Sequence, residues 1–374
     1  MISPKDFYNA LKEEEIDFFS GVPDSLLKDI CAYITDNTEK SKHIIAANEG
    51  NAIALAAGYH LATNKIGLVY MQNSGEGNAV NPLVSLADKE VYSIPMLLII
   101  GWRGEPGKKD EPQHKKQGRI TLDLLKTLEI PYKILSSNIN DTQNEVKELI
   151  KEIKDKSCPG AIVIREGTFE KYSLSSKSSN PYSLTREEAL KTVIDCIGNS
   201  IVVSTTGKLS RELFEYRETL KQTHEKDFLT VGSMGHASQI ALGISLSKPD
   251  KDVYCLDGDG AAIMHMGSLA IIGSNAKNNF KHIIFNNGSH ESVGGQPTAA
   301  FEINLSKIAE SCGYKKVLRA KNLEELKSNL EIIKSTNGPA LLEIMIKSGA
   351  RADLGRPTTT PIENKQAFME FIKK

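Results

Sequence analysis

Two apolar runs that each end in a polar, glycine-flanked group constrain this chain most. Residues 253–256 (Val-Tyr-Cys-Leu) lead into Gly258-Asp259-Gly260. Residues 282–285 (His-Ile-Ile-Phe) lead into Asn286-Asn287-Gly288. Short apolar runs beside glycine-rich turns predict buried strands, and the intervening residues have room for one crossover helix. Parallel strands joined in this way end at the same edge of a sheet, so a carboxylate and a carboxamide are expected there together.

The residue types at these two turns suit a metal ion and a diphosphate. Mg²⁺ is a hard cation that prefers oxygen ligands and takes few protein side chains, so Asp259 and an Asn amide oxygen fit it. Gly258 and Gly260 let the backbone approach a phosphate, and the amides that open a helix at Ala261 carry a partial positive charge. A plain strand-turn-helix would also explain Gly-Asp-Gly alone, but the Asn pair that follows favours the metal site.

This pairing of Gly-Asp-Gly with a later Asn-Asn resembles the thiamin diphosphate (thiamine pyrophosphate) signature. The resemblance implies thiamin diphosphate and Mg²⁺ as cofactors. It implies Asp259, Asn287 and the main-chain carbonyl of Ser289 as the metal ligands, with Gly258, Gly260 and Ala261 beside the diphosphate.

Composition narrows the class of protein further. The chain has 374 residues, enough for two domains with full cores, and a formal net charge of −1. The lysines are spread along the chain, which gives no basic surface for nucleic acid and favours small-molecule partners. The five cysteines are far apart and odd in number, so we expect buried free thiols in a reducing compartment.

The ends and apolar stretches of the sequence do not indicate export or membrane insertion. The N-terminal residues enter an amphipathic helix with acidic residues at 13–15, unlike a signal peptide. The longest apolar stretch, 94–100, is too short to span a bilayer and reads as a buried strand. We therefore expect a cytoplasmic protein.

Apolar runs alternate with helical patterns in two successive sets of six, which predicts an α/β protein with two doubly wound parallel sheets. The runs of the first set are 17–19, 43–47, 66–71, 95–100, 132–135 and 161–164, and those of the second are 201–204, 228–231, 253–256, 282–285, 316–318 and 341–346. A Ser-rich stretch, 172–181, reads as a linker. The resemblance makes 1–175 a pyrimidine-binding domain and 183–374 a diphosphate-binding domain, with no middle domain.

Ligands of open parallel sheets bind beyond the carboxyl ends of the strands, so the residues that follow each run are the candidates. Asp24 and Ser25 precede a helix expected from Leu26, and both residues favour an N-cap. The resemblance adds a substrate-binding role, and the two roles are compatible.

Glu49 follows the second strand, in Asn48-Glu49-Gly50-Asn51, ahead of an Ala-rich helix over 52–62. A carboxylate there would complement the helix dipole. By the resemblance it is instead the catalytic carboxylate that hydrogen-bonds the pyrimidine N1′ of the cofactor.

The third and fourth strands end in two polar segments. The stretch 72–78 is either a polar turn or, by the resemblance, a wall of the active site, with Asn73 and Ser74 as substrate contacts. The charged stretch 103–119 is either a solvated surface or a closing lid that recognises an anion. The segments 110–114 and 117–118 resemble the phosphonopyruvate decarboxylases. The candidates in the stretch 103–119 are Arg103, Lys109 and His114, the last also as a catalytic residue.

In the second half, the resemblance gives Thr206 and Gly207 to the diphosphate, while Ser210 would cap a helix over 211–216. Met234 would ordinarily be a core residue. By the resemblance, Met234 wedges between the two cofactor rings and the carbonyl of Gly232 accepts a hydrogen bond from the cofactor's amino group.

Four further residues carry open alternatives. His290, in the glycine-rich stretch 289–298, is either a proton donor or a lid side chain. His265 is expected to be a core or capping residue. Arg351 and Arg356 follow the last strand and either bind an anion or form surface ion pairs.

Nearly the whole chain resembles the phosphonopyruvate decarboxylases, and the sulfopyruvate decarboxylases share much of the pattern. The resemblance implies decarboxylation of 3-phosphonopyruvate to phosphonoacetaldehyde in phosphonate biosynthesis. It also implies a homodimer or higher homo-oligomer, with Glu49 and Asp259 meeting at the subunit interface. The alternatives are sulfopyruvate or another 2-oxo acid as substrate, and a cofactor-binding sensor without turnover. A nicotinamide dehydrogenase is disfavoured because neither half has Gly-x-Gly-x-x-Gly after its first strand.

Overall fold

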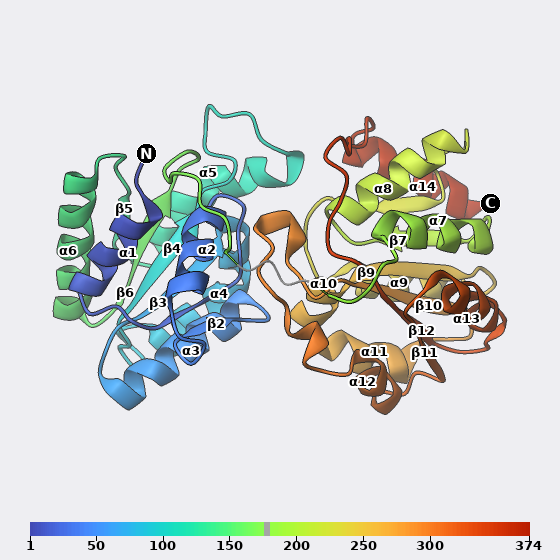
Figure 1. Ribbon diagram of the computed structural model, residues 1–374, viewed down its shortest axis with the longest axis horizontal. Coiled ribbons are helices and arrows are strands. Elements are labelled where there is room, and N and C mark those ends of the chain that lie inside the picture. The colour runs from blue at the N-terminus through green and yellow to red at the C-terminus, as the bar shows by residue number, and fades with distance from the viewer. Residues whose placement is uncertain (176–179) are drawn as a thin grey trace. The chain divides into compact units, whose positions relative to one another are not determined.

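The computed structural model describes residues 1–175 and 180–374. It forms two compact units, each built around its own parallel sheet (Figure 1). The first unit comprises the described residues up to 175 together with 290–296, and the second comprises the remaining described residues from 180 onward. The predicted domain boundaries at 175 and 183 flank positions 176–179, which lie outside the described residues.

The first unit has a six-stranded parallel sheet with the order β2-β1-β3-β4-β6-β5, as the alternation of apolar runs predicts. The strands are β1 (Phe19–Gly21), β2 (His43–Ile45), β3 (Gly67–Gln72), β4 (Met96–Gly101), β5 (Tyr132–Ile134) and β6 (Pro159–Ile164). The helices between and beside them are α1 (Pro4–Glu13), α2 (Lys28–Asn37), α3 (Glu49–Thr63), α4 (Glu76–Pro82), α5 (Pro112–Thr127) and α6 (Ile139–Lys156).

Alternate residues of the central strands enter two different cores because side chains of a strand point to opposite faces. Leu68 and Tyr70 pack with apolar side chains of α1, α2 and α6. Val69 and Met71 pack with those of α3, α4 and α5. Both faces of β3, β4 and β6 are therefore buried, which explains why these strands read as continuous apolar runs.

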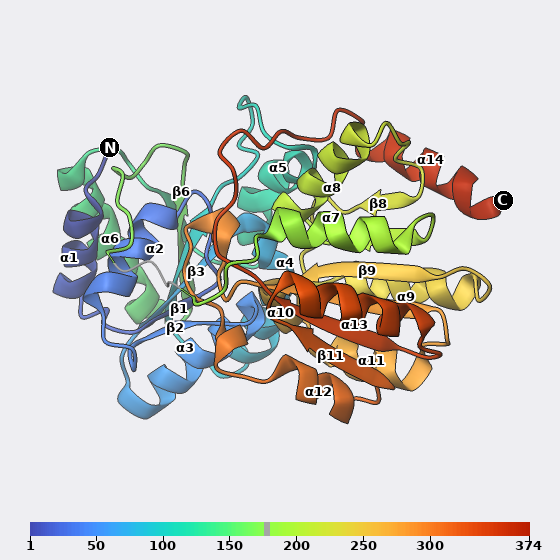
Figure 2. The same cartoon turned by 45° about the vertical axis from the view of Figure 1, so that its right-hand side comes forward.

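The second unit repeats this architecture with the strand order β11-β12-β10-β9-β7-β8. Its strands are β7 (Ile201–Ser204), β8 (Asp227–Leu229), β9 (Val253–Gly258), β10 (Phe280–Asn286), β11 (Lys316–Ala320) and β12 (Ala340–Met345). Its helices are α7 (Arg186–Ile197), α8 (Lys208–Thr219), α9 (Ala237–Ser247), α10 (Asp259–Met264), α11 (Gly267–Asn275), α12 (Leu305–Ser311), α13 (Leu323–Ser335) and α14 (Pro361–Lys373). One core lies between the sheet and α7, α8 and α13, and the other against α9, α11, α12 and α14 (Figure 2).

Strands β9 and β10 are hydrogen-bonded neighbours, with Gly258 opposite Phe285. Asp259 and Asn286 thus leave the sheet at the same edge, as expected. The crossover differs from the prediction of one helix, because the chain forms two short helices, α10 and α11. Helix α10 ends at Met264, with His265 as its C-cap, and Met266 precedes α11. A backbone hydrogen bond from the Ser268 N–H to the His265 carbonyl closes the bend between the two helices.

The predicted lid over 103–119 is wrong in extent. Helix α5 begins at Pro112, so only 103–111 is irregular. Proline at the first helical position is favourable because its missing N–H has no partner there in any case. The helix expected from Leu26 begins two residues later, at Lys28.

Other expectations concern the linker, the cysteines and the membrane. The described part of the 172–181 segment contains no helix or strand. All five cysteines are free, but Cys196 and Cys312 are partly exposed rather than buried. Within the ranges that the structure covers, no helix is both long and apolar enough to cross a membrane.

Candidate active site

Asp259 is the first residue of α10 and is almost fully buried. Its Oδ2 accepts a hydrogen bond of 2.5 Å from the Thr298 hydroxyl, and the backbone N–H groups of Asn287 and Gly260 also point to the carboxylate. The two turns after β9 and β10 are therefore in direct contact. Sequence reasoning placed Asp259 and Asn287 together but missed the contact with Thr298. The only sign of that contact in the sequence was the polar, glycine-rich stretch in which Thr298 lies.

Burial raises the pKa of Asp259 to about 6, although the Thr298 hydroxyl and the backbone N–H groups partly offset it. Among the described residues Asp259 forms no salt bridge. A buried carboxylate without a positive partner is costly, and a divalent cation would supply the missing charge. The donor set therefore fits Mg²⁺, which prefers carboxylate and amide oxygens.

The two asparagines have different tasks. Asn286 is fully buried and donates 2.7 Å to Glu343 Oε1, while its own Oδ1 accepts from the Gly288 N–H. Asn287 lies beyond the strand, and its Oδ1 accepts 3.0 Å from the Ser289 N–H. Asn286 is thus committed to the sheet, which leaves Asn287 as the candidate ligand.

The turn that carries Ser289 has a fixed shape. Gly288 has φ +66°, and a Cβ there would come within 2.4 Å of the Phe301 ring. Only glycine fits this left-handed position without displacing the ring. The Ser289 carbonyl, a predicted metal ligand, is therefore held on a constrained turn.

The predicted diphosphate contacts lie at the start of α8. Gly207 is its N-cap with φ 94°, and the Thr206 hydroxyl donates 2.8 Å to the Val231 carbonyl. The predicted cap at Ser210 is wrong, because α8 begins at Lys208 and places Ser210 inside its first turn. The Ser210 hydroxyl donates 2.7 Å to the Thr205 carbonyl instead.

Gly232 and Met234 lie in the irregular turn between β8 and α9. Both are half-buried, so Met234 is not a core residue of the second unit. The Met234 carbonyl lies 3.2 Å from His236 Nδ1. The wedge role of Met234 stays a prediction.

In the first unit, Glu49 is the first residue of α3 and is buried. Its Oε2 accepts 2.7 Å from Asn78 Nδ2, a contact that sequence reasoning missed. A Cβ on Gly75 would come within 2.3 Å of Glu49 Oε1. The amide and the glycine together hold this carboxylate in one rotamer, and its place at the helix start also suits the dipole.

A second buried carboxyl group, Glu76, opens α4 and was not anticipated. Its Oε2 accepts 3.3 Å from Gln117 Nε2, and its Oε1 is buried without a hydrogen-bond partner in the described chain. Burial raises the pKa of Glu76 to about 8, with Gln117 and Thr121 acting in the opposite direction. Glu76 is thus mainly protonated at neutral pH.

Asp24 is fully buried beside the ends of β1, β3 and β4. Its carboxylate accepts 2.5 Å from Gln72 Nε2 and 2.9 Å from the Leu26 N–H. A Cβ on Gly101 would come within 2.1 Å of this carboxylate, so Gly101 makes room for it. Burial raises the pKa of Asp24, while the Gln72 amide lowers it. Asp24 closes the turn before α2 but does not cap the helix, whose N-cap is Leu27.

Arg103 is neutralised within its own segment. Two of its guanidinium nitrogens contact the Asp110 carboxylate, at 2.8 and 2.5 Å, and a third donates 2.7 Å to the Ser25 hydroxyl. Such a bidentate pair is geometrically specific. Asn73 binds the backbone N–H and carbonyl of Arg103 and the Thr121 hydroxyl, and its contact with the substrate stays a prediction.

The other first-unit candidates differ in exposure. Ser74 and Lys109 are exposed, and the Ser74 hydroxyl donates 2.7 Å to Gln72 Oε1. His114 is buried in the first turn of α5. Burial and the neighbouring Arg103 lower the pKa of His114, which makes it uncharged at neutral pH. His114 would therefore meet an anionic substrate without a charge of its own, and its predicted substrate-binding and catalytic roles stay predictions.

The remaining candidates lie near loops. Arg351 pairs with Glu187, Glu215 and Asp353, which agrees with the surface ion-pair alternative. Arg356 is exposed. His290 precedes a short 3₁₀ helix, and its backbone N–H donates 2.8 Å to the Gln296 carbonyl.

Comparison with known proteins shows matches over both units. Residues 5–126 match the family described as thiamine pyrophosphate enzyme, N-terminal TPP binding domain. Residues 205–344 match the corresponding C-terminal TPP binding domain. The two matches cover the β-strand ends that carry Glu49 and Asp259.

The chain is also similar to curated proteins along its whole length. It is 33% identical to a phosphonopyruvate decarboxylase of Streptomyces viridochromogenes, covering 100% of this chain and 95% of that one. It is also 33% identical to a phosphonopyruvate decarboxylase of Streptomyces hygroscopicus, covering 99% of this chain and 94% of that one. A sulfopyruvate decarboxylase of Methanosarcina acetivorans is 24% identical, and the similarity covers 100% of this chain and 98% of that one. The chain therefore belongs to the thiamine pyrophosphate enzyme family, as a decarboxylase related to the phosphonopyruvate decarboxylases.

Proposed function

We propose that this chain decarboxylates 3-phosphonopyruvate to phosphonoacetaldehyde and carbon dioxide, with thiamin diphosphate and Mg²⁺ as cofactors. The observation that carries this proposal is the 33% identity to two phosphonopyruvate decarboxylases over nearly the full length of each chain. The buried Asp259, which lacks a positive partner among the described side chains, supports the metal requirement.

Thiamin diphosphate supplies the carbon nucleophile and the electron sink that decarboxylation of a 2-oxo acid needs. The residues of the chain bind and orient it. Asp259, Asn287 and the Ser289 carbonyl would hold a Mg²⁺ ion, which would supply positive charge for the diphosphate. Glu49, fixed by Asn78, would hold the proton at the pyrimidine nitrogen.

The substrate would meet the ends of β1, β3 and β4. Ser25 and Arg103 are joined there by a 2.7 Å hydrogen bond, and the buried Asp24 lies next to them. Because Asp110 already neutralises Arg103, the exposed Lys109 becomes the leading candidate for a cation that meets the phosphonate. A homodimer or higher homo-oligomer, with Glu49 and Asp259 meeting at the subunit interface, is part of the proposal because the family resemblance implies it.

The experiment compares substrates. The purified chain with thiamin diphosphate and Mg²⁺ is assayed for carbon dioxide release from phosphonopyruvate, sulfopyruvate and pyruvate. We expect the highest kcat/KM with phosphonopyruvate. A higher value with sulfopyruvate would assign the chain to the activity named for its Methanosarcina relative, and no release from any of the three would favour a cofactor-binding sensor.

A further inference from the structure

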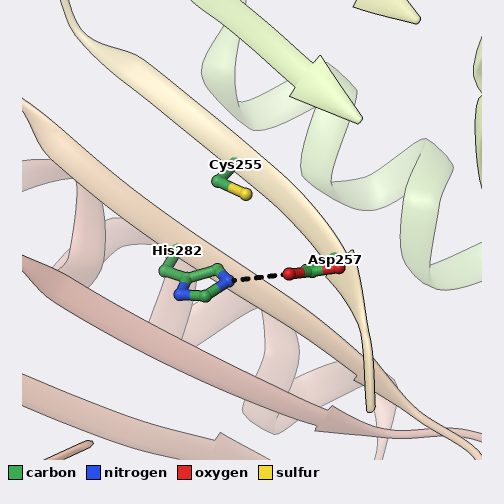
Figure 3. Close-up of side chains that lie close together, drawn as sticks. All are labelled: Cys255, Asp257 and His282. Atoms are coloured by element: carbon green, nitrogen blue, oxygen red, sulfur yellow. Dashed lines mark ion pairs between the residues drawn. The ribbon is translucent and has the colours of Figure 1, made fainter. Parts of the chain in front are cut away.

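Three buried side chains in the second unit have no role in the proposed reaction. Cys255 and Asp257 lie two residues apart on β9 and so share one face of the sheet. His282 lies on β10 directly opposite Cys255. The sulfur, one carboxylate oxygen and one ring nitrogen all lie within 4.8 Å of one another (Figure 3). All three side chains are inaccessible to solvent.

The atoms that face the centre of this cluster are not satisfied. Asp257 Oδ2 and His282 Nε2 are both buried without a hydrogen-bond partner in the part of the chain that is described. They face each other at 3.5 Å, longer than an ordinary N–H···O hydrogen bond. Two buried polar atoms without hydrogen-bond partners are unfavourable unless a bound ion or molecule between them contacts both.

The atoms on the outer side of the cluster are engaged. His282 Nδ1 lies 3.1 Å from the Tyr314 hydroxyl, and Asp257 Oδ1 accepts 2.9 Å from the Gly258 N–H. If Nδ1 carries the ring proton and donates it to Tyr314, the lone pair of Nε2 points into the cluster. Metal-binding histidines and carboxylates are typically oriented in this way by their outer atoms.

The donor set and its spacing suit zinc. Zn²⁺ binds nitrogen and oxygen at about 2.0–2.1 Å and sulfur at about 2.3 Å, so tetrahedral ligands are about 3.3–3.6 Å apart. The 3.5 Å between Asp257 Oδ2 and His282 Nε2 agrees with that spacing. A thiolate and a carboxylate also balance the two positive charges of the ion, which matters in a buried site. Mg²⁺, by contrast, prefers oxygen ligands alone.

We propose that Cys255, Asp257 and His282 bind a Zn²⁺ ion, separate from the Mg²⁺ of the cofactor site. This ion would join β9 to β10 immediately before the turn that carries Asp259. Since Asp257 also binds the Gly258 N–H, zinc would help to fix the start of that turn. The proposal does not depend on which 2-oxo acid is the substrate.

The full-length chain is produced with added zinc salt, desalted, and analysed for bound metal by mass spectrometry. A second sample is loaded with Co²⁺, whose thiolate complex has a charge-transfer absorption in the near ultraviolet. We expect near-stoichiometric zinc and that absorption in the parent chain. Cys255→Ser should lose the absorption, and His282→Gln should lower the zinc content at least several-fold.

Two control variants separate this site from others. Cys312→Ser changes a partly exposed thiol of the same unit, and Asp259→Asn changes the proposed Mg²⁺ site. Both should keep zinc and the cobalt spectrum. Because the parent chain alone is decisive, misfolding of a variant does not obscure the result. A parent chain without bound zinc and without the cobalt–thiolate absorption would overturn the proposal, as would a spectrum that survives in Cys255→Ser.

Discussion

Replacing Glu76 with Gln is expected to remove a loss of stability that the first unit suffers as pH rises. The pKa of this carboxyl group is about 8 in the folded chain, against an ordinary value of 4.5. Between these values the unfolded chain loses the proton while the folded chain keeps it, so stability is greatest at low pH and falls as pH rises. The full difference corresponds to about 5 kcal/mol, of which roughly 3 kcal/mol is lost between pH 5 and pH 8.

Glutamine resembles the protonated carboxyl group in shape but cannot ionise. Glu76→Gln should therefore match the parent chain near pH 5 and exceed its stability by roughly 3 kcal/mol at pH 8. The assay is urea unfolding at a series of pH values, followed by tryptophan fluorescence. Trp102 is the only tryptophan in the sequence, and it is buried in the same unit as Glu76, with its Nε1 donating 2.8 Å to the Gly118 carbonyl.

The matched control is Glu13→Gln, which removes an exposed carboxylate from α1. It should leave the pH dependence of the tryptophan transition close to that of the parent chain. The reasoning is refuted if Glu76→Gln changes the pH dependence of unfolding no more than Glu13→Gln does. Glu76 would then be ionised in the folded chain, and burial would not raise its pKa.

Two single variants and one set of alanine variants test the candidate active site. Asp259→Ala should abolish metal-dependent binding of thiamin diphosphate in calorimetry, and unchanged affinity would refute the metal assignment. Glu49→Gln should keep cofactor binding but slow turnover by roughly 10²- to 10⁴-fold, the range for positioned acid-base groups; full activity would leave only the helix-dipole role. Alanine variants of the five residues proposed to bind the anion should be assayed with phosphonopyruvate and pyruvate, since a charge-assisted contact is worth roughly 1.5–3 kcal/mol, or about 10- to 100-fold. A selective loss with phosphonopyruvate marks the contact, and an unchanged kcat/KM ratio in all five would place the anion site elsewhere; the five are Arg103, Lys109, His114, Arg351 and Arg356.

The strand pattern was readable from the sequence because both faces of these sheets are buried, which produces uninterrupted apolar runs between glycine-rich turns. The contact between the Asp259 and Asn287 turns was readable for the same reason, since parallel neighbours end at one edge. Charge composition misled at 112–119, where lysines and polar residues were interpreted as part of a closing lid although the segment is the start of α5. Pro112 was the overlooked sign, because proline favours the first position of a helix.

Side-chain pairing over long sequence distances was not readable. Asn73 was interpreted as a substrate contact because it follows a strand, and the hydrogen bonds of its amide to the backbone of Arg103, thirty positions away, were not anticipated. The neutralisation of Arg103 by Asp110 likewise depends on how the segment folds back. Burial of Glu76 was hidden because one glutamate beside glycines is ordinarily solvated.

Direct observation of the product tests the central claim most sharply. Phosphorus NMR of the purified chain with 3-phosphonopyruvate should show conversion to phosphonoacetaldehyde that requires both thiamin diphosphate and Mg²⁺. At equal protein concentration, conversion should be lost in the Asp259→Ala sample and slowed by roughly 10²- to 10⁴-fold in the Glu49→Gln sample. Persistence of the 3-phosphonopyruvate signal in the fully supplemented parent sample, or turnover without thiamin diphosphate, would contradict the account.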